Sequence, residues 1–177
     1  AFPYRHDSAL TDRDIADLWA AFRTVPPVAG NAPEHDLSFP FDRRALLRTW
    51  KVLFFDPSLL ADDPARSFEW NRGRYLVEGP GHCGACHTPR NLLGASMAGA
   101  ALKGTTGANG EIIPALTPAA LDKAGYSATD IGIALKTGVT PEGDALGGSM
   151  SEVVSGGTGF WSKDDLMAVA RYLREEN

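Results

Sequence analysis

The chain carries the pentapeptide Cys83-Gly84-Ala85-Cys86-His87 near its middle. The pattern C-x-x-C-H is typical of covalent c-type haem attachment. Two thiols one helical turn apart can add across the two vinyl groups of one porphyrin, and the residue that follows then lies beneath the iron. His87 can therefore donate an imidazole nitrogen to the iron as the proximal ligand. The motif predicts one haem c, bound covalently through Cys83 and Cys86.

Three other interpretations of the two cysteines are weaker. A zinc ribbon needs a second C-x-x-C pair, whereas the sequence holds 2 cysteines in all. A thioredoxin-type redox pair is expected within a βαβ pattern, which the sequence does not show. A structural disulfide would explain neither the two-residue spacing nor the adjacent His87. We therefore interpret the motif as a haem site.

Composition and charge limit the classes of function. The 177 residues carry a net charge of −5 and no basic run, so nucleic-acid binding is not indicated. No apolar stretch approaches the ~20 residues that span a membrane. No secretory signal is visible, although c-type haem is attached in the bacterial periplasm or an equivalent compartment. We therefore expect a periplasmic protein in a processed or trimmed form.

Helix signals recur along the whole chain, and no segment is a convincing strand. Capping residues followed by apolar positions at helical spacing, and then by glycine or proline, define six predicted helices. Their starting residues are Thr11, Asp42, Ser67, Thr117, Ser127 and Ser162, and stop signals follow at Pro26, Asp56, Gly79 and Gly138. The pattern predicts an all-α protein.

One internal repeat links the first of these predicted helices with the last. At a constant spacing, Thr11, Asp14, Ile15, Leu18, Phe22 and Arg23 align with Ser162, Asp165, Leu166, Val169, Leu173 and Arg174. Any capped amphipathic helix could produce this similarity. Alternatively, both segments are the closing helix of a haem domain, and residues 1–25 then end an upstream domain.

A haem iron with histidine on one face usually takes a second side chain on the other. We assign this distal position to Met150, because Gly147 and Gly148 precede it in a glycine-rich loop that can bring the backbone close to the ring. Met97 follows the haem motif too closely, and Met167 lies within the last helix. We expect only packing roles from these two methionines.

The remaining histidines are poorer candidates for the distal ligand. His82 adjoins the attachment cysteines and is too constrained to reach across the porphyrin. His6 and His35 are expected to be surface or linker residues.

Residues 72–79 and 82–91, which include the haem motif, resemble multihaem cytochrome c subunits of bacterial membrane-associated dehydrogenases of the alcohol, gluconate, sorbitol and molybdenum-hydroxylase types. The likeness extends to residues 146–153 as the methionine-ligand loop. It also covers segments before the haem motif, at residues 1–4, 24–28, 39–41 and 50–55. The resemblance implies a class I cytochrome c domain over residues 67–177. It also implies that residues 1–66 are a helical extension resembling the tail of an upstream cytochrome domain.

The same resemblance suggests roles for individual residues near the haem. Pro114 corresponds to the family's proline whose carbonyl accepts the Nδ1–H of the proximal histidine, which orients the imidazole and makes it a better donor. Gly73 and Tyr75 resemble the small and aromatic residues of the first helix that pack on the last helix through Tyr172. Arg90 is a candidate partner for a haem propionate, although a solvated surface arginine is the alternative.

The resemblance implies one-electron transfer rather than catalysis. The protein is expected to accept electrons from a dehydrogenase and to pass them to a cytochrome or oxidase of the respiratory chain. A haem enzyme or sensor with an open sixth coordination position is one alternative, and a haem-bearing fragment without an independent role is another. Residues 1–60 are expected to hold no second haem and to pack against the haem domain or a partner through Trp19, Phe22, Trp50, Phe54 and Phe55.

Overall fold

The computed structural model describes residues 4–31, 33, 36–40, 42–57, 60–107 and 110–175. Helices dominate the described part of the chain, and the all-α prediction is confirmed. In chain order the elements are α1 (Tyr4–Asp7), α2 (Asp12–Phe22), α3 (Arg44–Phe54), α4 (Phe68–Glu78), α5 (Gly84–His87), η1 (Ala98–Ala100), β1 (Thr105–Thr106), β2 (Ile112–Ile113), α6 (Pro118–Lys123), α7 (Ala128–Thr137), α8 (Ser149–Gly156), η2 (Thr158–Phe160) and α9 (Lys163–Arg174).

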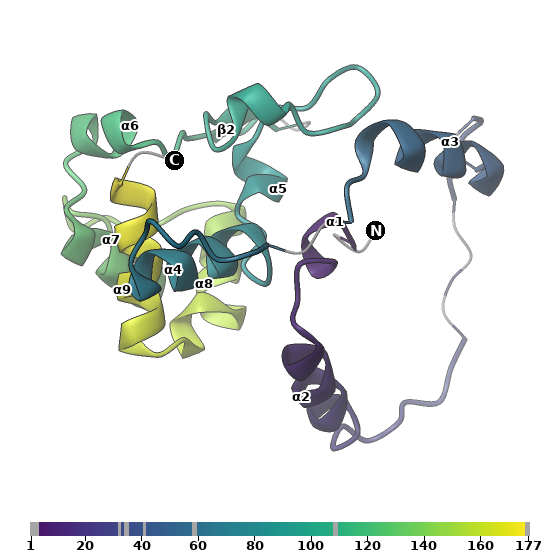
Figure 1. Ribbon diagram of the computed structural model, residues 1–177, viewed down its shortest axis with the longest axis horizontal. Coiled ribbons are helices and arrows are strands. Elements are labelled where there is room, and N and C mark those ends of the chain that lie inside the picture. The colour runs from purple at the N-terminus through teal and green to yellow at the C-terminus, as the bar shows by residue number, and fades with distance from the viewer. Residues whose placement is uncertain are drawn as a thin grey trace.

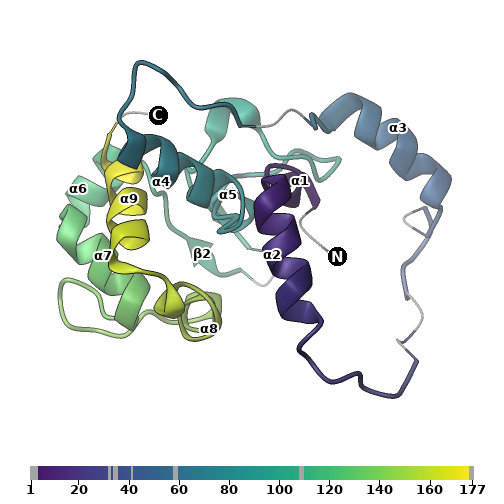
Figure 2. The same cartoon turned by 60° about the horizontal axis from the view of Figure 1, so that its bottom comes forward.

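The core is built on the crossing of α4 and α9, which lie side by side in Figures 1 and 2. The two helix backbones are in contact at Gly73, where an added Cβ would lie only 2.0 Å from the carbonyl oxygen of Ala168. The Tyr172 hydroxyl donates a hydrogen bond of 2.6 Å to the Glu78 carboxylate at the same crossing. The predicted packing of Gly73 on the last helix at Tyr172 is therefore confirmed. The hydroxyl of Tyr75, the other residue of the predicted pair, instead donates to the Asp14 carboxylate of α2 at 2.5 Å.

Most predicted helix starts are confirmed by their hydrogen bonds. The hydroxyls of Thr11, Ser67 and Ser162 each accept from the backbone N–H three residues on. Ser127 forms a capping box that opens α7, and Gly138 ends that helix in the left-handed conformation. These signals lie within a few residues of each other, so the sequence alone can specify them.

Two local predictions were wrong. The second predicted helix was expected to open at Asp42, but α3 begins at Arg44 without a side-chain cap. The Asp42 carboxylate instead faces the Arg43 guanidinium at 3.3 Å. No strand was expected either, whereas β1 and β2 form a short antiparallel hairpin. Each strand has two residues, which is too short to produce a visible alternation of apolar and polar positions.

The helices before residue 60 lie outside the compact body formed by α4–α9 (Figures 1 and 2). None of α1, α2 and α3 contains a buried residue. Trp50 does reach the body, because its indole N–H donates to the carbonyl of Leu93 at 2.8 Å, and the Phe54 ring lies beside it at a tilted angle. Trp19 and Phe22 are 66% and 61% exposed, so they do not pack against the body.

Among the described residues, no helix combines the length and the apolar character needed to cross a membrane.

Candidate haem-binding site

The two cysteines lie on one tight turn. Cys83 precedes α5, and its carbonyl accepts from the backbone N–H groups of Cys86 at 3.2 Å and His87 at 2.9 Å. Both cysteines are free thiols, with Cys83 packed against the core cluster and Cys86 exposed. Burial raises the pKa of the Cys83 thiol to about 11. A neutral sulfur is therefore strongly favoured at this position, as a thioether bond to a porphyrin would provide.

His87 is held in the tautomer that a metal ligand requires. The side chain is only 5% exposed, and its Nδ1 donates to the carbonyl oxygen of Pro114 at 2.8 Å. Because a carbonyl can only accept, the proton is on Nδ1 and the lone pair is on Nε2. No other described residue bonds to the ring. Burial lowers the pKa of His87, opposed by the bond to Pro114, so the imidazole is neutral at pH 7.

The β1–β2 hairpin fixes the position of Pro114. Thr105 pairs with Ile113, immediately before the proline, and Leu116 after it donates its N–H to the carbonyl of Leu102 at 2.8 Å. At the base of the hairpin, Gly104 has a φ of 77°, and an added Cβ would lie 2.7 Å from the nitrogen of Ala115. Only glycine fits this close approach. The β1–β2 hairpin was not predicted from the sequence, yet the carbonyl that accepts the hydrogen bond from His87 lies directly after it.

Met150 lies in the first turn of α8 and is half-buried. The sequence predicted a glycine-rich loop here, and Gly147 and Gly148 do form the end of a loop, but Met150 itself is helical. Gly148 is the N-cap residue with a φ of 58° and a ψ of −144°, a conformation that side-chain-bearing residues rarely adopt. The sharp change of direction at Gly148 thus starts α8 directly before the methionine.

The donors at the attachment turn fit a haem. Cys83 is one of a set of apolar residues that are only partly buried where they pack against the core. This set comprises Tyr75, Cys83, Leu116, Tyr126, Ala128, Leu135 and Trp161. A flat, largely apolar ring bound at Cys83 would add apolar contact to this part of the core, and Nε2 of His87 would be available to its metal. The donor set of two thiols and one neutral imidazole therefore suits haem c.

Comparison with known proteins places these features in a family context. No protein-family model matches the chain. A diheme cytochrome c-type protein of Cereibacter sphaeroides is 43% identical over 175 residues, covering 98% of this chain and 57% of that protein. The fructose dehydrogenase cytochrome subunit of Gluconobacter japonicus is 37% identical over 177 residues, covering 98% of this chain and 36% of the subunit.

The chain is a homologue of dehydrogenase cytochrome c subunits. The cytochrome c subunit of the quinone-dependent alcohol dehydrogenase of Gluconobacter oxydans is also similar, with 38% identity over 98% of this chain and 38% of that subunit. The all-α architecture and these relatives agree with a class I cytochrome c fold. The chain spans just over half of the diheme relative and about a third of the fructose dehydrogenase subunit. Several relatives are named as cytochrome subunits rather than as the catalytic subunits of their enzymes.

Arg90 braces the segment that follows the haem motif. The side chain is exposed, and its guanidinium donates to the carbonyls of Gly94 at 2.9 Å and Ala85 at 3.1 Å. These two bonds tie the loop after the motif to α5. The guanidinium has five N–H donors, so these bonds leave it able to bind a carboxylate, and the propionate contact stays a prediction.

The other histidines and methionines differ in part from expectation. His6 is not simply a surface residue, because it is half-buried and its Nδ1 donates to the carbonyl of Glu78 at 2.7 Å. His82 is exposed, and His35 lies outside the described residues. Met97 and Met167 are both exposed, so neither lies in the core. Met167 does pack on α7, with its sulfur 3.4 Å from where a Cβ on Gly132 would lie.

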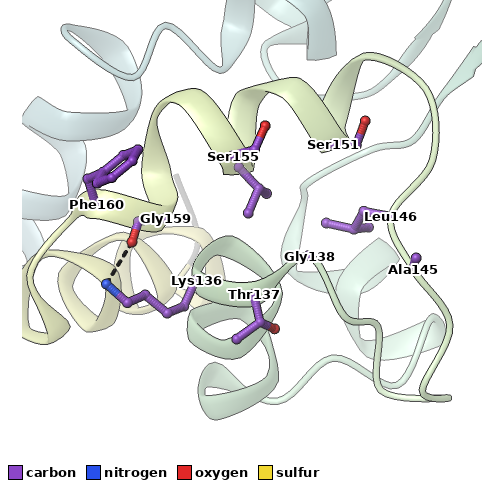
Figure 3. A pocket seen from close by; sticks show the side chains of 10 residues that line it. Lys136, Thr137, Gly138, Ala145, Leu146, Ser151, Ser155, Gly159 and Phe160 are labelled. Atoms are coloured by element: carbon purple, nitrogen blue, oxygen red, sulfur yellow. Dashed lines mark hydrogen bonds between the residues drawn. The ribbon is translucent and has the colours of Figure 1, made fainter.

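A hollow of about 360 Å³ lies between the end of α7 and α8, and Figure 3 shows the residues that line it. The Lys136 side chain runs along one side of it, and its ammonium group donates to the carbonyl of Gly159 at 2.7 Å. Leu146 and Val154 supply apolar lining. None of the predicted haem residues lines this hollow, so it is separate from the attachment turn.

Proposed function

We propose that the chain is a one-electron carrier with a single haem c bound through Cys83 and Cys86 and ligated by His87 and Met150. The observation that carries this proposal is the His87 imidazole. It is buried and neutral, its Nδ1 is committed to Pro114, and its Nε2 lone pair is available one turn from two free thiols. A histidine that ligates a metal typically donates its other ring N–H to a carbonyl in this way.

When bound, the haem supplies an iron that alternates between the ferrous and ferric states. The residues of this chain set which state is preferred. Apolar side chains that pack against the core, Cys83 among them, would shield a haem bound at Cys83 from water and so disfavour the extra positive charge of the ferric form. The Pro114 carbonyl strengthens the His87 imidazole as a donor, which acts in the opposite direction. A thioether at Met150 is a soft, neutral ligand that favours the ferrous state and raises the reduction potential.

The names of the relatives support a redox partner for this carrier. Relatives named as cytochrome subunits of fructose, alcohol and gluconate dehydrogenases favour a dehydrogenase as electron donor. We propose a cytochrome or oxidase of the respiratory chain as acceptor. Because c-type haem is attached outside the cytoplasm, we place the protein in the periplasm.

We further propose that residues 67–177 are the haem domain and that residues 1–66 include the closing helix of an upstream domain. The internal repeat supports this. In α9, Leu166, Val169 and Leu173 are 4%, 2% and 3% exposed. The aligned residues Ile15, Leu18 and Phe22 of α2 are 49%, 50% and 61% exposed. The two helices thus share caps and apolar positions, but only α9 has its apolar face covered.

Haem attachment and ligation can be tested on the chain produced in a host that matures c-type cytochromes. Haem staining after denaturing electrophoresis should follow the monomer, and acid-acetone should not extract the haem. The ferrous protein should not bind carbon monoxide, because both axial positions are filled. Immediate carbon monoxide binding would instead indicate a haem enzyme or sensor with an open position.

Three methionine variants test the distal ligand in the same preparation. Met150→Ala should lower the reduction potential, open the iron to carbon monoxide and abolish the weak red band of ferric methionine-ligated haem. Met97→Leu and Met167→Leu are nearly volume-conserving controls that should leave the spectrum unchanged and cost less than ~1.5 kcal/mol of stability. A Met150→Ala protein with the wild-type ferric spectrum would exclude Met150 as ligand.

A further inference from the structure

The carboxylate of Glu111 lies directly against the backbone that begins α8. A Cβ placed on Gly148 would be 2.1 Å from Oε1 of Glu111 and 3.1 Å from its carboxyl carbon. The positive φ of 58° disfavours a side chain at position 148, and an added Cβ would also displace this carboxylate. The contact joins residues that are distant in sequence, and one of them is two residues before Met150.

The start of α8 is a favourable place for a negative charge. The first N–H groups of a helix have no partners within the helix, and together with the aligned peptide dipoles they create a partial positive charge. Gly148 has no side chain with which to cap them. The Glu111 carboxylate thus brings to this helix end, from another part of the chain, the negative charge that an acidic capping residue would supply.

The backbone of Glu111 is itself fixed by the hairpin. Its carbonyl accepts from the N–H of Gly107 at 2.7 Å, and the next residue, Ile112, pairs with Thr106. Three residues after Glu111, the carbonyl of Pro114 accepts from His87. One short hairpin therefore contacts the segment that carries the proposed proximal ligand and the segment that carries the proposed distal ligand.

We propose that Glu111 is a positioning residue that holds the start of α8, and with it Met150, in place for binding the iron. This inference rests on the proposed function, because it takes Met150 as the distal ligand. The hairpin contacts the segments of both proposed ligands: Pro114 fixes the imidazole of His87, and Glu111 restrains the segment that carries Met150. Loss of the carboxylate should let the Met150 segment open more often.

Imidazole binding to the ferric protein measures this opening, because exogenous imidazole can bind only after the methionine leaves. Glu111→Ala should increase the affinity for imidazole by about two- to fivefold, the range expected for a charge at a helix N-terminus. Glu111→Gln, which keeps the shape, should show a smaller increase, and it also serves if the alanine variant folds poorly. Glu142→Gln, at an exposed acidic residue on the loop between α7 and α8, is the control for loss of one negative charge near this segment and should match the wild type.

The result that overturns the inference is an unchanged imidazole affinity in both Glu111 variants, or an equal increase in Glu142→Gln. Thermal unfolding of the same variants separates positioning from general destabilisation, since loss of this one contact should lower the midpoint by no more than about 4 °C and general destabilisation would lower it further. Met150→Ala, measured in parallel, separates this inference from the proposed function. If Met150→Ala opens the iron and the Glu111 variants do not, only the inference fails. If Met150→Ala keeps the wild-type spectrum, both fail.

Discussion

Gly73→Ala should destabilise the protein, because the crossing of α4 and α9 leaves no room for a methyl group. The added Cβ would lie 2.0 Å from the carbonyl oxygen of Ala168, 2.6 Å from its carbonyl carbon and 2.8 Å from the Cβ of Tyr172. Ordinary contacts between such atoms are longer by about 1 Å. Two of the three neighbours are backbone atoms, so the strain cannot be relieved by rotating a side chain. The two helices would have to move apart.

The expected cost follows from opposing contributions. Overpacking a well-packed core costs about 1–3 kcal/mol, and a clash with backbone belongs at the upper end of that range. Alanine is a better helix former than glycine by roughly 0.5–1 kcal/mol, which offsets part of the cost. The net loss is about 2 kcal/mol, or a fall in the thermal unfolding midpoint of roughly 8 °C at about 4 °C per kcal/mol.

Gly132→Ala is the matched control, since Gly132 also lies inside a helix that packs on α9. There the added Cβ would meet only the flexible Met167 sulfur, at 3.4 Å. This variant should gain the same helix propensity without the clash and should be neutral or slightly more stable. Thermal unfolding followed by circular dichroism measures both variants. The reasoning is refuted if Gly73→Ala is as stable as Gly132→Ala.

Two further predictions concern stability. The Arg72 guanidinium, bonded to Asp165 at 2.7 Å, holds the pKa of that carboxyl below its ordinary value of 3.8. The stabilising contribution is therefore present above that value and is lost as the pH falls through the lower folded-state pKa. As the pH falls from about 5 to about 2, the Asp165→Asn protein should lose less stability than the wild type. Urea unfolding measures both losses, and equal losses would contradict this. Leu173→Ala should cost about 2–5 kcal/mol, whereas the aligned Phe22→Ala should stay within about 0.5 kcal/mol in this chain and become costly only where an upstream domain covers α2. A costly Phe22→Ala in the 177-residue chain, measured by urea unfolding, would count against an uncovered α2.

Short-range signals account for what the sequence could predict. The caps at Thr11, Ser67, Ser127 and Ser162 each bond within three residues, so the residue types specify the structure directly. The spacing of the haem motif is likewise local, since one helical turn separates the two thiols. The Pro114 contact was anticipated through family resemblance, because nothing in its own neighbourhood indicates a partner 27 residues away.

Contacts between distant segments account for what the sequence could not predict. The hydrogen bond from His6 to the Glu78 carbonyl joins residues 72 positions apart, and no sequence pattern around either residue indicates it. The sequence likewise does not indicate that Glu111 approaches Gly148. The glycines at 104 and 110 could, however, have indicated a tight hairpin. Met150 was expected in a loop because glycines precede it, but Gly148 turns the chain sharply enough for α8 to start at once.

Covalent haem at the attachment turn is the central claim, and a peptide mass tests it most directly. Trypsin should release residues 75–90, which contain both cysteines and His87 between the cleavage sites at Arg74 and Arg90. Mass spectrometry of the digest under denaturing conditions should find this peptide carrying one haem through two thioether bonds. Recovery of the peptide at its unmodified mass, with free thiols or a disulfide between Cys83 and Cys86, would contradict the account.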